Sequence, residues 1–287
     1  MNTDNVNNVF EDMDLSTNGL NKKQDAQIEE KTGFDITSWN QIINMQKTTN
    51  SEIDPEWEKK KLDWTTAMVV ESSELIDSIN WKWWKHMITD WDNIEIEMID
   101  LLHFIFAKAI ELKTESELYA IVIVKESSVQ KMSRDKELSD YIINEVSQML
   151  IPAILREDMI YTIMIWLDIW FKLGYTSNDI FKVYKMKNVL NKFRQNHNYK
   201  TGTYKKLWNG LEDNVYAQRV TKNIQYTNNF CDELYNELET IYSELDDKTI
   251  DNFVHSSDEW EFIMTKLSKQ DRELFFKFAT DFEKYKK

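Results

Sequence analysis

Residues that break helices are scarce along the whole chain. Five glycines and two prolines occur in 287 residues, and 13% of the residues are aromatic. Because glycine and proline supply most of the turns between strands, their scarcity favours long helices over a β-rich fold. The chain is also long enough to bury a large core. We therefore expect an all-α fold, built as a multi-helix bundle.

Apolar residues recur at helical spacing through most of the chain. Asp35 or Thr37 can cap the first expected helix, Asp54-Pro55 can open the second, and Asp90 or Asp92 can cap the third. The expected helices run over about 38–50, 55–79, 91–112, 115–128, 136–150, 152–173, 178–196, 230–247 and 258–285.

Composition also limits the location and the partners. Cys231 is the only cysteine, so no internal disulfide can form, which is typical of a reducing compartment. The first residues lack the basic and apolar regions of a secretory signal, and no apolar stretch is long enough to span a membrane. The net charge of −15 argues against nonspecific binding of nucleic acid. We expect a cytoplasmic protein, with the nucleus left open, that binds neither membrane nor nucleic acid.

Two pairs of acidic residues are the first candidates for chemistry. Glu71 and Glu74 stand three residues apart in one expected helix, and Glu97 and Asp100 stand three apart in the next. This spacing places both members of a pair on one helix face. An ionised carboxylate inside an apolar run, such as that of Asp100, is costly unless a cation or hydrogen-bond donors compensate it. Four carboxylates on two packed helices could hold Mg²⁺, which prefers oxygen ligands and shares its remaining positions with phosphates.

A basic segment provides the second candidate site. Residues 182–206 contain eight Lys or Arg and no Asp or Glu. Within it Lys187, Asn191 and Arg194 recur on one helix face. Although the chain as a whole is acidic, this segment could therefore bind an anionic substrate.

These motifs resemble a known family. The pattern E-x-x-E, 22 intervening residues and E-x-x-D (71–100) is similar to that of the all-α nucleoside triphosphate pyrophosphohydrolases. The flanking WKWWK (81–85), the HF pair (103–104) and KNVLNKFRQNHNYKTGTYKKLWNGLEDN (187–214) resemble the dimeric dUTPases within that group. The resemblance covers roughly 37–230 and implies a bundle of this type with a helical insertion. It further implies a homodimer that hydrolyses dUTP to dUMP and pyrophosphate, and dUDP to dUMP and phosphate, by water attack at the α-phosphorus.

The resemblance also implies roles for individual residues. The metal ligands for two or three Mg²⁺ ions would be Glu71, Glu74, Glu97 and Asp100, with Glu71 also the general base. The residues that bind the base would be Gln46, Asn50, Trp81, His103 and Phe104. The residues that bind sugar or phosphates would be Lys187, Asn191, Arg194, Tyr199, Lys200, Lys206 and Asn214. Trp83 and Trp84 are expected to serve packing alone, and Leu102 stands where relatives often have tryptophan.

The extent of the resemblance, together with the composition of the two ends, predicts a domain organisation. We expect a polar, mobile N-terminal extension (1–34), a catalytic domain (35–230) with a helical insertion (114–151), and an acidic helical C-terminal extension (231–287).

Other interpretations stay open at this point. The acids could form the salt-bridged edge of a helix stripe, His103 could be a core histidine, and the basic face could simply be solvated. A related pyrophosphohydrolase acting on another nucleotide would keep the four acids. Asp100 and His103 suggest a di-iron bundle, but that needs a second acid-x-x-His unit, which the chain lacks. A non-catalytic helical adaptor, or an RNA-binding protein using 182–206, is the alternative of a different class.

Overall fold

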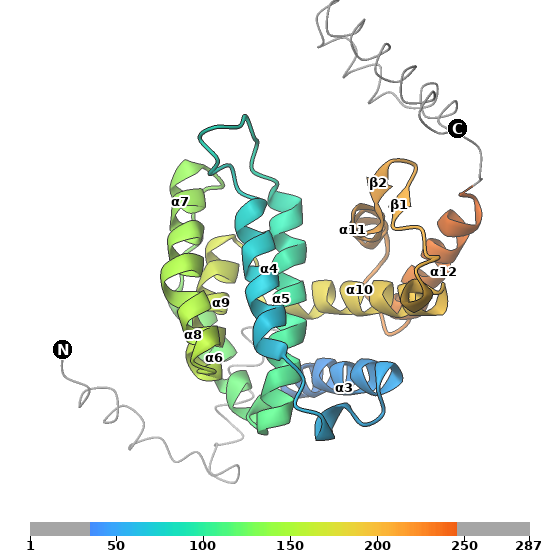
Figure 1. The fold of residues 1–287 in the computed structure, drawn as a ribbon, viewed down its shortest axis with the longest axis horizontal. Helices are drawn as coiled ribbons and strands as arrows, with labels where there is room; N and C mark the ends of the chain where they lie inside the picture. The colour runs from blue at the N-terminus through green and yellow to red at the C-terminus, as the bar shows by residue number, and fades with distance from the viewer. Residues whose placement is uncertain (1–34, 246–287) are drawn as a thin grey trace, which may run out of the picture.

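The computed structural model of the protein describes residues 35–245. Within this range the regular elements are helices apart from one short β-hairpin, which confirms the predicted all-α fold. The helices of Figure 1 are α3 (Ile36–Ile53), α4 (Trp64–Asp77), α5 (Trp91–Leu112), α6 (Glu115–Ser128), α7 (Lys136–Glu145), α8 (Ile151–Leu155), α9 (Met159–Lys172), α10 (Ser177–Asn196), α11 (Asp213–Asn223) and α12 (Phe230–Ser243). Strands β1 (Leu207–Trp208) and β2 (Leu211–Glu212) pair antiparallel. The predicted extension 1–34 and the predicted helix 258–285 lie outside the described residues.

Helix α5 forms the centre of the fold. Most of its side chains between Ile94 and Ile110 are buried, on every face of the helix. A helix that is apolar all round is stable only when other elements surround it. Accordingly α5 packs along α4 and contacts α3, α9 and α10. The indole N–H of Trp166 on α9 donates to the carbonyl oxygen of Met98 at 2.7 Å. Polar side chains carried by α5 are therefore held in the interior of the molecule.

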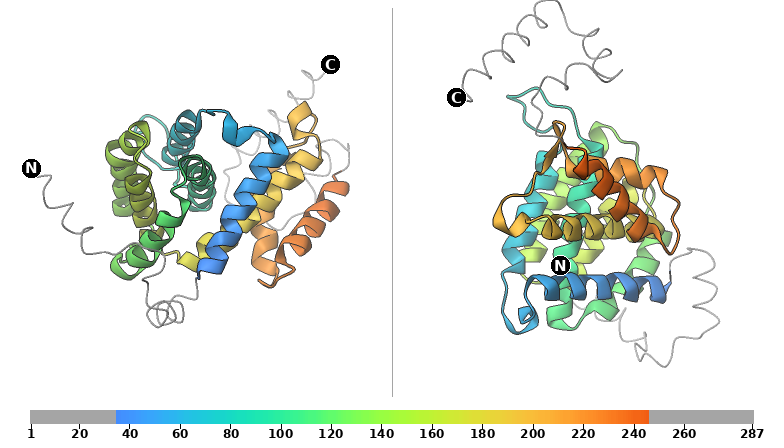
Figure 2. Two further views of the ribbon diagram at one scale, coloured as in Figure 1. Left: turned by 90° about the horizontal axis from the view of Figure 1, so that it is seen from below. Right: turned by 90° about the vertical axis from the view of Figure 1, so that its right-hand side faces the viewer.

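Helix α10 links the two halves of the molecule. Figure 1 shows α4 and α5 standing side by side with α6 to α9 on one flank, while α10 runs across to the other flank. In both views of Figure 2, α3 lies alongside α10. Helices α11 and α12 pack on α10, and the β-hairpin leads into α11. The acidic helices and the basic helix therefore meet at one junction.

Side-chain caps set the helix starts. Asp35 and Asp90 each accept a hydrogen bond from the backbone N–H three residues ahead, so both are caps as predicted. The predicted start at Asp54-Pro55 is wrong, because Asp63 caps α4 in the same way. The segment before it forms a 3₁₀ turn (Trp57–Lys59), in which the buried Trp57 indole donates to Ser51 on α3. Packing of that indole bends the chain away from a continuous helix.

The predicted helix over 152–173 is interrupted. A π-turn (Val146–Leu150) leads into α8, and Glu157 then takes a left-handed conformation with φ of 54°. Asp158 caps α9 from the next position. The Glu157 carboxylate lies 3.2 Å from the Lys108 ammonium, which is largely buried. This ion pair lies at the break between the two helices.

Two further features lie in the turns and loops. The hairpin was not predicted, although Asn209-Gly210, with φ of 47° and 85°, is the usual signal for a two-residue hairpin turn. Trp83 and Trp84 lie in the loop between α4 and α5 and are 91% and 58% exposed, so the packing expected of them consists, in residues 35–245, of ring contacts within this loop. They touch only edge to face, with ring centroids 5.7 Å apart. None of the helices in residues 35–245 combines the length and apolar character that crossing a membrane requires.

Candidate active site

Three carboxylates from two helices converge at the junction. Glu71 comes from α4, and Glu97 and Asp100 come from one face of α5. Each offers an oxygen atom, and these atoms lie within 4.8 Å of one another. The i, i+3 spacing on α5 and the close packing of α4 on α5 produce this arrangement. Glu74, the fourth predicted acid, is exposed and lines the cavity beside this acidic cluster.

Burial and mutual repulsion make the ionised form of the acidic cluster unfavourable without a cation. Burial, followed by repulsion from Asp100 and Glu74, raises the pKa of Glu71 to about 8. Burial and repulsion from Asp100 likewise raise the pKa of Glu97 to about 7, although Lys187 acts against the increase. Part of the compensation comes from Asn93, whose amide donates to Glu97 at 2.9 Å and to Ser78 at 2.8 Å. A clustered set of oxygen donors with excess negative charge fits a hard divalent cation.

Helix α10 brings a buried ammonium against this cluster. Lys187 is 1% exposed, and its Nζ lies 2.9 Å from Asp100 Oδ2. The same Nζ donates to Asn214 Oδ1, on α11, at 2.7 Å. The predicted metal and phosphate residues therefore meet directly, although they stand far apart in sequence.

Arg194, the second cation of the site, is held by a residue that the sequence did not single out. Asp213 is fully buried and accepts from Arg194 Nε at 2.8 Å and from Arg194 Nη2 at 2.7 Å. It also accepts from the Tyr204 hydroxyl at 2.7 Å. Arg194 donates further to Asn191 at 3.3 Å and to Asn214 at 3.2 Å. The guanidinium is therefore fixed at the first turn of α11 rather than free in solvent.

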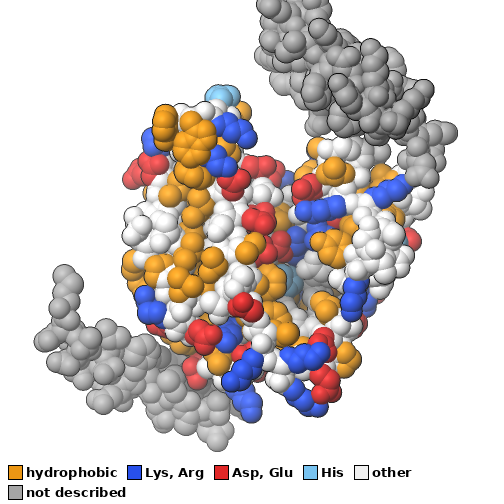
Figure 3. All heavy atoms as spheres, in the orientation of Figure 1, with side chains coloured by type: hydrophobic (Ala, Val, Ile, Leu, Met, Phe, Trp, Pro, Cys, Tyr) orange, Lys and Arg blue, Asp and Glu red, His pale blue; other side chains and the backbone are white. Residues whose placement is uncertain are grey.

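One cavity of about 500 Å³ is lined by several of these side chains, namely Glu74, Glu97, Asp100, Lys187, Arg194 and Asn214. Its walls are α5 on one side and α10, α11 and the β-hairpin on the other. Figure 3 shows the corresponding hollow, with acidic side chains along one wall and basic side chains along the other. Lys206 lies at the hairpin rim, where its ammonium is 3.3 Å from Glu212.

Below the acidic cluster, α3, α5 and α10 enclose a set of neutral polar side chains. Gln46 and Asn50 are buried on α3, and the Gln46 amide donates to Asn50 Oδ1 at 2.8 Å. His103 on α5 bonds Gln46 Oε1 through Nδ1 at 2.8 Å, and burial lowers the pKa of His103 to about 4. Tyr184 on α10 also donates to Gln46 Oε1. Three of the predicted base-binding residues thus form one connected group.

Other predicted residues lie outside this connected hydrogen-bonded group. Trp81 lies in the loop beyond the far end of α4 and contacts Trp84, so it is not part of the group around Gln46. Phe104 lies against Trp64, with ring centroids 6.2 Å apart. Tyr199 and Lys200 are exposed in the turn after α10.

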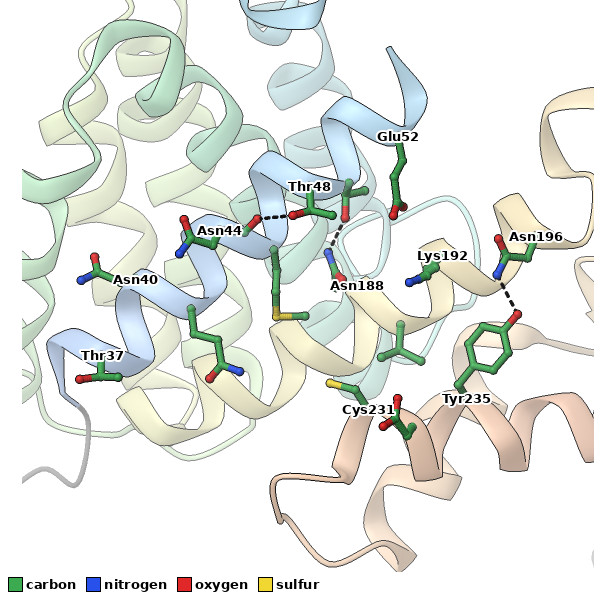
Figure 4. A pocket seen from close by; sticks show the side chains of 15 residues that line it. Thr37, Asn40, Asn44, Thr48, Glu52, Asn188, Lys192, Asn196, Cys231 and Tyr235 are labelled. Atoms are coloured by element: carbon green, nitrogen blue, oxygen red, sulfur yellow. Dashed lines mark hydrogen bonds between the residues drawn. The ribbon is translucent and has the colours of Figure 1, made fainter. Parts of the chain in front are cut away.

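The largest cavity described is not the acidic one. A groove of about 960 Å³ runs between α3, α10 and α12, lined by amides and hydroxyls (Figure 4). Its floor contains a hydrogen bond of 2.8 Å from the Asn188 amide to Thr49. Lys192, Glu52 and Asp232 are its charged residues, and no group of them forms a metal-ligand cluster in the described part of the chain. The chemistry is therefore assigned to the smaller, charged cavity.

A family of known proteins resembles this chain. A family model described as dUTPase matches residues 38–199, which is more than half of the chain. No curated protein matches the chain significantly. The matched range contains α3, α4, α5 and α10, the four helices that carry the acidic cluster, the buried cations and the Gln46 group.

Proposed function

Since the chain belongs to the all-α dUTPase family and is a dUTP diphosphatase, we propose that it converts dUTP to dUMP and pyrophosphate by attack of water on the α-phosphorus. By the same attack dUDP would yield dUMP and phosphate. The observation that carries the proposal is the direct contact of Lys187 with Asp100 inside a cavity lined by acids and cations. In such a site the carboxylates can bind metal ions and the cationic side chains can bind the phosphates of a nucleotide.

Glu71, Glu74, Glu97 and Asp100 would hold two or three Mg²⁺ ions. Their support is the oxygen-only donor set of Glu71, Glu97 and Asp100, together with the pKa values of Glu71 and Glu97, which burial and repulsion between the acids raise. When bound, such cations supply charge against the triphosphate oxygens and make a water molecule easier to deprotonate.

The chain's own residues would move the proton and place the substrate. Glu71 would accept the proton of the attacking water, since it has the most perturbed carboxyl of the cluster and stands on the opposite helix from Glu97 and Asp100. The new bond joins the water oxygen to the α-phosphorus, and the bond from that phosphorus to the bridging oxygen breaks. The electron pair leaves with pyrophosphate, or with phosphate when dUDP is the substrate.

Lys187 and Arg194 would stabilise the charge that develops on the leaving group. Both are buried and held by Asp100, Asn214 and Asp213, so they are positioned before substrate arrives. Lys187 contacts the acidic cluster directly, with its Nζ 2.9 Å from Asp100 Oδ2. The remaining residues assigned to sugar or phosphates are Asn191, Tyr199, Lys200, Lys206 and Asn214.

The base would bind against Gln46, Asn50, His103 and Phe104. Asn50 Nδ2 and His103 Nε2 are buried and have no hydrogen-bond partner among the described residues, so a polar ligand edge could satisfy both. Trp81 could complete this pocket only from a second copy, as in the homodimer that the family resemblance implies, because its loop lies at the other end of α4.

A nucleotide panel tests the proposal. Purified protein is offered dUTP, dUDP, dCTP, dTTP and UTP with Mg²⁺ or with a chelator, and phosphate and pyrophosphate are measured separately. We expect turnover of dUTP and dUDP only, and only with Mg²⁺. Release of phosphate rather than pyrophosphate from dUTP would place the attack at another phosphorus. Preference for a different nucleotide would assign the site to a related pyrophosphohydrolase.

A further inference from the structure

Four polar side chains from three helices form one buried hydrogen-bonded group, the Gln46 network. Its members are Tyr184 on α10, Gln46 and Asn50 on α3, and His103 on α5. Tyr184 is fully buried and stacks on the His103 ring, with centroids 4.1 Å apart and an interplanar angle of 26°. Among residues 35–245, its hydroxyl has one hydrogen-bond partner, the side-chain oxygen of Gln46. Tyr184 is outside the set of residues assigned to the base above.

The direction of each hydrogen bond follows from Gln46. A carboxamide oxygen can only accept, and Gln46 Oε1 faces both the Tyr184 hydroxyl and His103 Nδ1. Each of those two groups must therefore donate. Because burial keeps His103 neutral, its ring carries a single proton, which is on Nδ1. His103 Nε2 is left as a bare acceptor, with no partner in the described chain.

The other end of the network has the opposite character. Gln46 Nε2 donates to Asn50 Oδ1 at 2.8 Å, so the Asn50 oxygen is occupied. The Asn50 amide nitrogen retains hydrogen atoms without a partner in residues 35–245. The network therefore offers one free acceptor and one free donor, both attached to side chains that Gln46 orients.

We propose that Tyr184 is the positioning residue that sets uracil specificity, by fixing the Gln46 carboxamide so that His103 Nε2 accepts and Asn50 Nδ2 donates. This inference rests on the proposed function. Uracil presents an N3–H donor beside a carbonyl acceptor, which matches that acceptor and donor. Cytosine presents a bare N3 beside an amino group, which places acceptor against acceptor and donor against donor. Such mismatches between buried groups discriminate strongly.

Tyr184 stabilises this orientation because its hydroxyl needs an acceptor. If the Gln46 carboxamide rotated by half a turn, its NH₂ group would face Tyr184 and His103. The buried Tyr184 O–H would then lose its acceptor, which is unfavourable. The proton of His103 would shift to Nε2, and the Asn50 amide would turn so that Nδ2 donates to Gln46 Oε1. Asn50 Oδ1 would then be free, a pattern that suits cytosine. Without the hydroxyl, nothing in the Gln46 network opposes this rotation from the α10 side.

The test combines a spectrum with a specificity ratio. Nitrogen NMR of the unmodified protein, with the His103 signal assigned from a His103→Asn sample, reports which ring nitrogen carries the proton. We expect the Nδ1–H form. In Tyr184→Phe we expect the ratio of kcat/KM for dUTP over dCTP to fall at least about tenfold, which corresponds to about 1.4 kcal/mol, and the Nε2–H form to appear.

Tyr141→Phe is the matched control. It removes another tyrosine hydroxyl that donates to a single acceptor, Asp168, between α7 and α9. We expect it to lower thermal stability without changing the specificity ratio. An Nε2–H form in the unmodified protein, or an unchanged ratio in Tyr184→Phe, overturns the proposal. The spectrum of the unmodified protein needs neither a folded variant of Tyr184 nor enzymatic activity. Absence of dUTP hydrolysis would therefore contradict the proposed function, whereas an Nε2–H form of His103 would separately contradict the role of Tyr184.

Discussion

Asp213→Asn is the most informative single substitution at the phosphate side of the site. Asp213 is fully buried and accepts three hydrogen bonds, two from Arg194 and one from Tyr204. The asparagine preserves shape and one oxygen, but it places an NH₂ group against a donor and removes the countercharge of a guanidinium that is only 9% exposed. Removing one partner of a buried ion pair costs about 3–5 kcal/mol. Because one acceptor remains, we expect a loss of about 3 kcal/mol in the free energy of unfolding.

The pH dependence of that loss has a definite sign. Hydrogen bonding and attraction from Arg194 outweigh burial and lower the pKa of Asp213 in the folded protein. A lowered folded pKa contributes stability that is present above the unfolded value, about 4 for Asp, and is lost as the pH falls through the folded value. The difference in unfolding free energy between parent and Asp213→Asn should therefore be full at neutral pH. It should shrink only in strong acid.

Urea denaturation followed by circular dichroism measures this difference. The control is Asp140→Asn, which breaks an exposed i, i+4 ion pair with Lys136 and should change stability by less than about 0.5 kcal/mol. We also expect Asp213→Asn to lower kcat/KM for dUTP, because Arg194 loses its fixed position. A neutral-pH stability equal to that of the parent would refute the argument that Asp213 holds Arg194.

The remaining substitutions address the acidic cluster and the basic helix. Glu71→Gln should lower kcat by roughly 10²- to 10⁴-fold in a pyrophosphate-release assay, the usual contribution of a general base; near-parental kcat would remove Glu71 from that role. Arg194→Ala should lower kcat/KM for dUTP, whereas Lys192→Ala, an exposed cation on the same helix, should not; equal effects would point to general charge rather than position. Mg²⁺ at about 100 times its Kd should raise the unfolding free energy by about 2.7 kcal/mol, and Glu97→Gln should weaken this gain when both proteins are heated at matched ionic strength.

Much of the fold follows from local sequence signals. The apolar run of α5, the Asp90 cap and the acidic pair on its face all lie within one helix, so spacing alone indicates them. The family motif extends this to Lys187 and Arg194, which lie in the matched range. The hairpin could also have been predicted, since Asn209-Gly210 is a local signal that the helix-rich composition obscured.

The partners of these residues could not be predicted in the same way. Tyr184 lies among the lysines of α10 and bonds Gln46 across 138 positions, so its role depends on how α3 packs against α10. Asp213 is one of many acids in an acidic chain, and its partner Arg194 is known only once α11 is placed on α10. The start of α4 depends likewise on the burial of Trp57 against α3. The spacing of residues along the sequence identifies the helix face on which a side chain lies. The residue that it contacts on another helix depends on how the helices pack.

The charge balance of the cavity leads to a last prediction, that nucleotide and metal bind cooperatively. Six carboxylates and three cations line the cavity, so its net charge is negative and would repel a polyphosphate that arrives without metal ions. Divalent cations reverse that sign, and thermodynamic linkage requires each ligand to raise the affinity for the other by the same factor. Calorimetry with a dUTP analogue that cannot be hydrolysed at the α-phosphorus should show at least about tenfold tighter binding with Mg²⁺ than with chelator, a coupling of about 1.4 kcal/mol. Equal affinity in the two conditions would mean that Lys187 and Arg194 suffice for the phosphates, and that the acidic cluster serves another purpose.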